Sequence, residues 1–261
     1  MYGHHERVIR RMTERFQDDP AVLALIIIGS VARGDARADS DVDCHLVVTD
    51  DAYEARRAAH QLSVNADDLC DYPHGHAGGR VVNLGYLQDA AARGPEPVRF
   101  AFVHATPAFA RVPDLDQLLA AIPRYPEHER TEKMISFASQ LPVHLSYLVL
   151  GEYSQNPYLL AQTAVELVLF GGRLILAHNR MLYPNRKWFM QEFERAPEKP
   201  HDIIPIARQL LQQPDIAVAT TFCERILQFQ PWPQPPEGAM ERFQNDREMQ
   251  WQHGGVPLAD S

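Results

Sequence analysis

The spacing of apolar residues in the first half of the chain predicts both strands and helices. Val22–Ile28 is continuously apolar, which is typical of a strand in the middle of a sheet. Val42–Val48 is predicted to be a second strand, and Arg80–Leu87 and Val98–Val103 are predicted to be further strands. His5–Phe16 has its apolar residues at helical spacing, so a helix is predicted before the first strand. Other helices are predicted over Ala52–Leu62, Gln88–Arg93 and Leu115–Ile122.

The pattern changes after Pro123, and the second half is predicted to be helical. Helical spacing extends from residue 127 to residue 229, with predicted breaks at Pro142 and at later proline-containing segments. Asn156, followed by proline, is a helix-start signal and predicts a helix over Tyr158–His178. The last thirty or so residues are rich in proline and then amphipathic.

This layout predicts an α+β protein. A small mixed-sheet domain is expected over residues 1–123 and an all-helical domain over residues 124–230. Residues 231–261 are expected to form a proline-rich tail with an amphipathic helix.

Composition and charge narrow the classes of protein that fit this layout. Hydrophobic residues make up 45% of the chain, which excludes a disordered protein. The net charge of −9 disfavours a protein that grips nucleic-acid phosphates, because such binding needs clustered cations. The three cysteines form no CxxC pair, the chain start has no leader-like apolar run, and no apolar run is long enough to cross a bilayer. We therefore expect a cytoplasmic protein with neither a membrane nor a nucleic acid as partner.

The residues that indicate chemistry lie where the first strand ends and the second begins. Gly29 and Ser30 follow the first strand, and ten residues separate Ser30 from Asp41. Asp41 and Asp43 alternate at the start of the second strand, so their carboxylates are expected to point the same way. Two oxygen ligands suit Mg²⁺, which takes its other ligands from water and substrate phosphates. Gly29 would let backbone amides approach a phosphate, and the Ser30 hydroxyl would donate to it.

Ser40 offers another donor beside this turn, and Arg33 offers a cation. The whole pattern, G-S-x-A-R-G followed by S-D-x-D, resembles the signature of the DNA polymerase beta-like nucleotidyltransferase superfamily. The two-domain layout resembles the branch that adenylylates antibiotics such as aminoglycosides and lincosamides. The resemblance implies transfer of a nucleoside monophosphate, usually AMP from ATP, to a hydroxyl group, with release of pyrophosphate. It implies that Gly29 and Ser30 hold the triphosphate and that Asp41 and Asp43 bind Mg²⁺.

The family usually has a third carboxylate on a later strand, which acts as metal ligand or base. Asn83 stands where that acid is expected. The alternatives are Asp71, a glutamate of the helical domain (Glu152 or Glu166), or no third acid. A general base contributes about 10²–10⁴-fold in rate, so its loss would weaken the chemistry without abolishing it. The alternative function is a catalytically weakened nucleotide-binding or interaction protein of the same fold.

The helical domain adds Lys187, which resembles the lysine that reaches the nucleotide phosphates in aminoglycoside-adenylylating relatives. A surface lysine beside a packed Trp188 is the structural alternative. Arg173 and His178 have the R-x₄-H spacing of the HEPN ribonucleases, but on a helix they lie about 140° apart, so this function is disfavoured. The expected partner is a small-molecule hydroxyl acceptor, and the acidic chain is compatible with a cationic one. The sequence makes no prediction of the oligomeric state.

Overall fold

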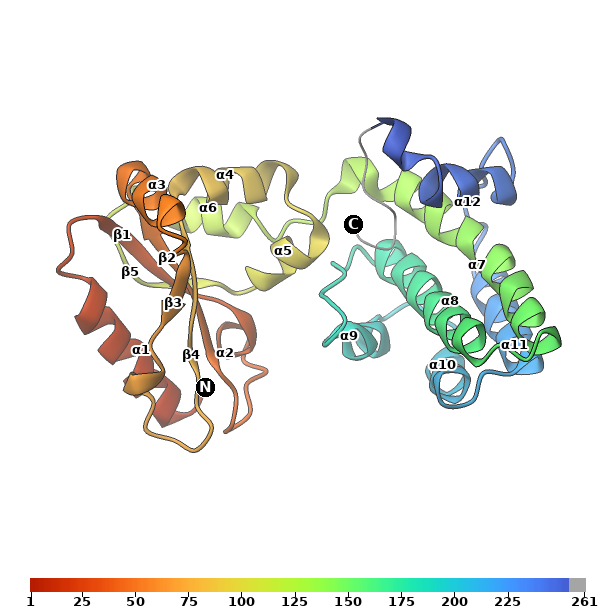
Figure 1. The fold of residues 1–261 in the computed structure, drawn as a ribbon, viewed down its shortest axis with the longest axis horizontal. Helices are drawn as coiled ribbons and strands as arrows, with labels where there is room; N and C mark the ends of the chain where they lie inside the picture. Colours follow the sequence, from red (N-terminus) through yellow and green to blue (C-terminus); the bar gives the residue numbers. More distant parts are fainter. Residues whose placement is uncertain (254–261) are drawn as a thin grey trace. The chain divides into compact units, whose positions relative to one another are not determined.

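The computed structural model describes residues 1–253. The chain forms two compact units, and the boundary between them in the sequence lies between Arg124 and Tyr125 (Figure 1). The first unit contains a five-stranded sheet in the order β3-β4-β2-β1-β5. Only β2 and β4 run parallel, so the sheet is mixed, and the predicted α+β class is confirmed. The strands are β1 (Val22–Ile27), β2 (Val42–Val48), β3 (Ser63–Asn65), β4 (Ala77–Val82) and β5 (Thr106–Ala110).

Helices cover both faces of this sheet. On one face α1 packs Val8 and Met12 against alternate residues of β2 such as Cys44. On the other face Val47 meets the buried side chains of α4 to α6, such as Leu87. The helices of this unit are α1 (Gly3–Phe16), α2 (Gly29–Arg33), α3 (Asp50–Ala58), α4 (Leu84–Arg93), α5 (Glu96–Ala101) and α6 (Leu115–Ala121), with a 3-10 turn over Asp67–Leu69.

One predicted strand is only partly confirmed, and another is wrong. The segment Arg80–Leu87 leaves the sheet at Val82, because the Asn83 side chain accepts a hydrogen bond of 3.0 Å from the Tyr86 amide and starts α4. The segment Val98–Val103 is mostly helical, because α5 begins at Glu96 and has Pro97 in its first turn, where proline suits a helix start. A short apolar run is compatible with either a strand or a buried helix. In these two segments the residues at the start of each helix favour the helix. The true last strand, β5, was not predicted.

The second unit is helical, as predicted. Its helices are α7 (Arg130–Tyr153), α8 (Pro157–His178), α9 (Phe189–Arg195), α10 (Ile203–Gln212), α11 (Ile216–Leu227) and α12 (Ala239–Arg247), with 3-10 turns over Glu127–Glu129 and Gln250–His253. Asn156 caps α8 by accepting a hydrogen bond of 3.2 Å from the Leu159 amide, as predicted. The predicted break at Pro142 is wrong, because α7 continues through it. A proline removes one helical hydrogen bond, and the close packing of α7 on α8 holds the helix together.

Contrary to the expectation from the sequence, two segments of this unit, Glu127–Tyr153 and Pro157–His178, are long and apolar enough to cross a membrane. In each, 61% of the apolar window is buried inside the protein. The same helices bury the polar residues Gln140, His144 and Arg173. Their apolar character therefore belongs to the core of the helical unit.

The tail after residue 230 contains the amphipathic helix α12. Arg242 pairs with Glu132 of α7, and Arg247 pairs with Glu166 of α8 at 2.7 Å. These contacts attach α12 to the other helices of the second unit. The rest of the predicted tail, residues 254–261, lies outside the described part of the chain.

Candidate active site

The turn after β1 brings Gly29 against the Asp43 carboxylate. Gly29 has a φ of +72°, a left-handed conformation that favours glycine. A Cβ atom built at this position would lie 2.5 Å from Asp43 Oδ2. The Ile28 amide also donates a hydrogen bond of 3.0 Å to the Asp43 carbonyl oxygen. The glycine of the motif is thus required twice, for its backbone angle and for the space that the carboxylate fills.

Asp41 and Asp43 flank Val42, the first residue of β2. Both aspartates are exposed, whereas Val42 and Cys44 are buried on the α1 side of the sheet. Within residues 1–253 no three His, Cys, Asp or Glu side chains are close enough to share a metal ion. Carboxylate oxygens are ligands that suit Mg²⁺, an ion that takes further ligands from water and phosphate. Metal binding by Asp41 and Asp43 stays a prediction.

The chain just before Asp41 is held by two residues that the sequence analysis did not select. The Ser40 carbonyl oxygen accepts hydrogen bonds from His5 Nε2 (3.1 Å) and from the Tyr72 hydroxyl (2.8 Å). His5 is fully buried, and this burial lowers its pKa, so the ring is neutral at neutral pH. His5 shares a helical face with Val8 and Met12, and this spacing is the one signal that could have marked it as buried.

Ser30, Ser40 and Arg33 lie around the same turn. Ser30 is buried in α2, and the Ser40 hydroxyl accepts a hydrogen bond of 2.8 Å from the Arg37 amide, which leaves its own proton available. The Arg33 side chain is only 6% exposed. Its guanidinium lies 4.7 Å from the centre of the Phe100 ring and donates to Asp35 at 3.3 Å. The contact with Phe100 connects α2 to α5. Phosphate binding by Arg33 stays a prediction.

Asp71 is held by arginines of α1. Its carboxylate accepts hydrogen bonds of 2.9 and 3.1 Å from Arg7 and lies 3.3 Å from Arg11. The hydrogen bonds from Arg7 lower the pKa of Asp71. The role of Asp71 as the third acid stays a prediction.

The interpretation of Asn83 as a replaced third acid is wrong. Asp43 pairs with Gly78 on β4, and Asn83 comes five residues later, roughly 16 Å along a strand. There Asn83 caps α4 and donates a hydrogen bond of 2.9 Å to Asp50. It therefore lies at the other end of the sheet from the motif aspartates.

The predicted residues of the helical unit have contacts of their own. Lys187 is exposed, with its Nζ 5.3 Å from the centre of the Trp188 ring, and it precedes α9 by two residues. Burial acts to raise the pKa of Glu166, but His144 (3.0 Å) and Arg247 outweigh it and lower that pKa to about 2. Glu166 is therefore an ion-paired carboxylate. Glu152 is exposed on α7.

Arg173 and His178, the R-x₄-H pair, both contact other side chains of the helical unit. Arg173 is 3% exposed and lies over the rings of Phe137 (4.4 Å) and Tyr183 (4.7 Å). His178 Nε2 lies 2.8 Å from a Glu198 carboxylate oxygen. These partners account for both side chains without a ribonuclease site.

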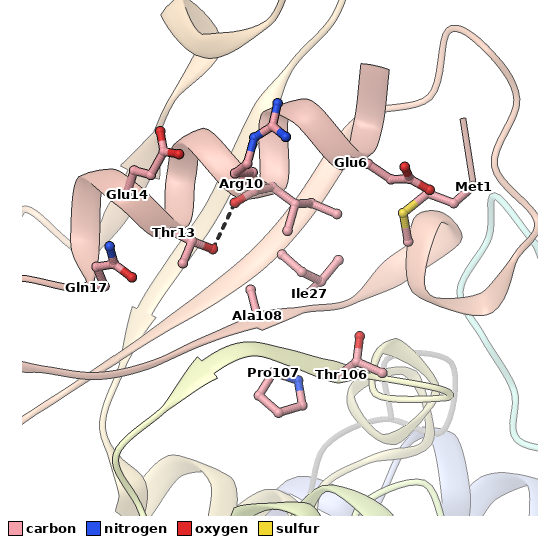
Figure 2. Close-up of a pocket in the computed structure, with 11 residues that line it drawn as sticks. Met1, Glu6, Arg10, Thr13, Glu14, Gln17, Ile27, Thr106, Pro107 and Ala108 are labelled. Carbon is pink, nitrogen blue, oxygen red and sulfur yellow. Dashed lines mark hydrogen bonds between the residues drawn. The ribbon is translucent and has the colours of Figure 1, made fainter. Parts of the chain in front are cut away.

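A groove of about 570 Å³ lies between α1 and β5 in the first unit (Figure 2). Polar side chains of α1, such as Glu6 and Arg10, form one wall, and Thr106 to Ala108 of β5 lie opposite. The Thr13 hydroxyl in this wall donates to the Ile9 carbonyl oxygen at 2.9 Å. None of the predicted site residues lines this groove, so we do not assign it as the active site.

The sequence model of the nucleotidyltransferase domain family matches residues 6–146, more than half of the chain. The solved structure of a nucleotidyltransferase-like protein from Exiguobacterium sibiricum 255-15 is similar at 14% identity, with a TM-score of 0.44 and coverage of 87% of this chain and 75% of that chain. A search among curated proteins gives no match.

Proposed function

This chain belongs to the nucleotidyltransferase domain family, and we propose that it transfers AMP from ATP to a hydroxyl group of a small-molecule acceptor, with release of pyrophosphate. The family supports nucleotidyl transfer from a nucleoside triphosphate. The observation that carries the proposal is the packing of Asp43 against Gly29, because it sets a carboxylate beside a turn that can approach phosphate.

In this proposal Asp41 and Asp43 hold Mg²⁺, which would neutralise phosphate charge and stabilise the attacking and leaving oxygens. The backbone at Gly29 and the Ser30 hydroxyl bind the triphosphate. Ser40 adds a hydroxyl donor, while Arg33 and Lys187 are the cations proposed for the nucleotide. His5 and Tyr72 hold the backbone that carries Asp41.

The proposed class of acceptor is inferred from the charge of the chain. A cationic polyhydroxyl compound of the aminoglycoside type suits a chain with a net charge of −9. The antibiotic-adenylylating branch and a cytoplasmic location belong to the same proposal. The weakened-enzyme alternative no longer rests on Asn83, which is a helix cap. It now depends on whether Asp71, Glu152 or Glu166 supplies a third acid.

Label transfer tests the proposal directly. The protein is incubated with α-labelled ATP, Mg²⁺ and a panel of aminoglycosides and lincosamides, and labelled products and pyrophosphate are followed. We expect Asp43→Asn to abolish transfer while the protein stays folded. Asp39→Asn is the matched control, because Asp39 is an exposed carboxylate of the same loop and pairs with Arg37. If ATP binds but no labelled AMP or product forms with any acceptor, the proposal is wrong.

A further inference from the structure

The fold holds the two motif aspartates by different means. Asp43 lies within β2, where its carbonyl oxygen accepts a hydrogen bond of 3.0 Å from the Ile28 amide and its backbone pairs with Gly78 of β4. Asp41 precedes β2, which begins at Val42. The sheet therefore fixes Asp43 from both sides, whereas the position of Asp41 depends on the residues next to it in the chain.

The peptide group between Ser40 and Asp41 is held by two side chains. The Ser40 carbonyl oxygen accepts a hydrogen bond of 3.1 Å from His5 Nε2 and one of 2.8 Å from the Tyr72 hydroxyl. A peptide group is planar, so the Ser40 carbonyl and the Asp41 amide turn together. The two donors therefore fix the plane from which the Asp41 side chain starts.

His5 is placed where an apolar residue would suit the fold better. It shares the buried face of α1 with Val8 and Met12. It is fully buried, and its Nδ1 atom has no hydrogen-bond partner within residues 1–253. A buried polar atom without a partner costs free energy. What the histidine adds to this face is the hydrogen bond from Nε2 to the Ser40 carbonyl oxygen.

Tyr72 is held by the same helix. Its ring lies edge-on to the His5 ring, with the ring centres 5.5 Å apart. Asp71, the residue before it, accepts hydrogen bonds of 2.9 and 3.1 Å from Arg7 of α1. The helix α1 thus supplies one donor to Ser40 directly and holds the segment that supplies the other.

We propose that His5 and Tyr72 are positioning residues for Asp41 and thereby set the affinity of the site for Mg²⁺, which rests on the metal role that the proposed function gives to Asp41. A carboxylate binds an ion well only where the groups behind it hold it in place. Loss of such a group typically lowers metal affinity about 10–100-fold. Because two donors share the Ser40 carbonyl, loss of one is expected to have an effect at the lower end of that range.

The test measures metal binding on the whole chain, separately from activity. The ligand is the Mn²⁺ complex of an ATP analogue with a methylene group between its α- and β-phosphorus atoms, and binding is followed by electron paramagnetic resonance. Tyr72→Phe removes one donor and keeps the ring, so its Kd for this complex should rise about tenfold. Binding of the analogue in EDTA, without metal, should not change.

His5 is tested by a pair of variants. His5→Met removes the donor and is expected to raise the same Kd about tenfold. His5→Gln keeps an N–H donor at the place of Nε2 and is expected to retain most of the affinity. A role in packing alone would not distinguish a glutamine from a methionine in this direction, because the methionine is the better core residue.

The transfer assay with α-labelled ATP gives a second measurement. Tyr72→Phe is expected to need about ten times more Mg²⁺ than the wild type for half its maximal rate, and to approach the wild-type rate at saturating Mg²⁺. A variant that had merely lost folded protein would be slower at every Mg²⁺ concentration.

The matched control is Tyr53→Phe. Tyr53 and Tyr72 are both partly buried against the core on the α1 side of the sheet. Tyr53 belongs to α3, which follows the other end of β2, roughly 20 Å along the strand from Asp41. This control should leave the Kd for the Mn²⁺ complex unchanged.

The outcomes separate the positioning role from the proposed function. An unchanged Kd in both Tyr72→Phe and His5→Met, or an equal rise in Tyr53→Phe, would overturn the positioning role and leave the proposed function standing. A wild type that does not bind the Mn²⁺ complex would overturn both. If the wild type binds the complex but forms no labelled product, the proposed function is wrong, and the Mn²⁺ affinities of the variants still decide the positioning role.

Discussion

Gly29 and Gly34 both have a positive φ, but only one of them also shapes the candidate site. Gly29 has the Asp43 carboxylate in the space of its missing Cβ, whereas Gly34, with a φ of +81°, has nothing within 4 Å of that position. Both residues need a left-handed backbone, which costs an alanine about 1–2 kcal/mol. Only Gly29 is tied to a predicted metal ligand. Gly34 is therefore needed only for its backbone conformation, whereas Gly29 is needed for its backbone conformation and for the position of Asp43.

We expect Gly34→Ala to lower the free energy of unfolding by about 1–2 kcal/mol and to keep transfer activity. Gly29→Ala should lose more stability and most of the activity, because its methyl group displaces Asp43. Urea unfolding and label transfer measure the two effects. Equal activity of the two variants would show that the Gly29–Asp43 contact is not needed for the reaction.

His45 gives the fold a dependence on pH. It is 6% exposed between the rings of Tyr86 and Phe102, and burial lowers its pKa from 6.5 to about 4. The unfolded chain binds a proton near pH 6.5, whereas the folded chain does so only near pH 4. Stability from this residue is therefore complete above pH 6.5 and is lost as the pH falls toward 4, by at most about 3 kcal/mol.

Replacement of this histidine removes the group that titrates. We expect His45→Phe to show a smaller loss of stability than the wild type between pH 7.5 and pH 5, since the ring environment suits an aromatic side chain. Urea unfolding at both pH values gives the comparison. If the variant and the wild type lose the same free energy of unfolding between pH 7.5 and pH 5, carboxylates alone cause the sensitivity to acid.

At the scale of elements, α12 is held to the helical unit by charge. Arg247 of α12 lies 2.7 Å from Glu166 of α8, and the two side chains are 19% and 13% exposed. Glu166 also faces His144, which is 2% exposed. Loss of the arginine would leave a mostly buried carboxylate with one partner fewer.

We therefore expect Arg247→Met to lower the free energy of unfolding by about 1.5–3 kcal/mol. Arg208→Met is the matched control, because Arg208 and Glu194 form an exposed pair, and such pairs contribute about 0–1 kcal/mol. Chemical unfolding followed by circular dichroism measures both variants. Similar losses in the two would contradict the role given to the contact between α12 and α8.

At the scale of the whole molecule, each unit has a hydrophobic core of its own. The sheet of the first unit is covered on one face by α1 and on the other by α4 to α6. The core of the second unit is built from its own helices. A unit that buries both faces of its sheet has what it needs to fold alone.

Residues 1–124, expressed as a separate chain, are therefore expected to fold and to unfold cooperatively on heating. The fragment should also bind ATP in the presence of Mg²⁺, because Gly29, Ser30, Asp41 and Asp43 all lie within it. Circular dichroism and equilibrium binding measure the two properties. A fragment without a cooperative transition would show that the first unit depends on the second.

The sequence by itself determined the α+β class, the helical second half, and the motif around Gly29 and Asp43. These features depend on local spacing, on caps such as Asn156, and on residues close together in the chain. The sequence did not determine which segment lies beside the motif, because β4 reaches it only through strand pairing. Tertiary structure decided that Asp71 pairs with Arg7 and that Gly78 of β4 pairs with Asp43, far from Asn83. Register between distant strands fixes such neighbours, and no pattern within one segment encodes it.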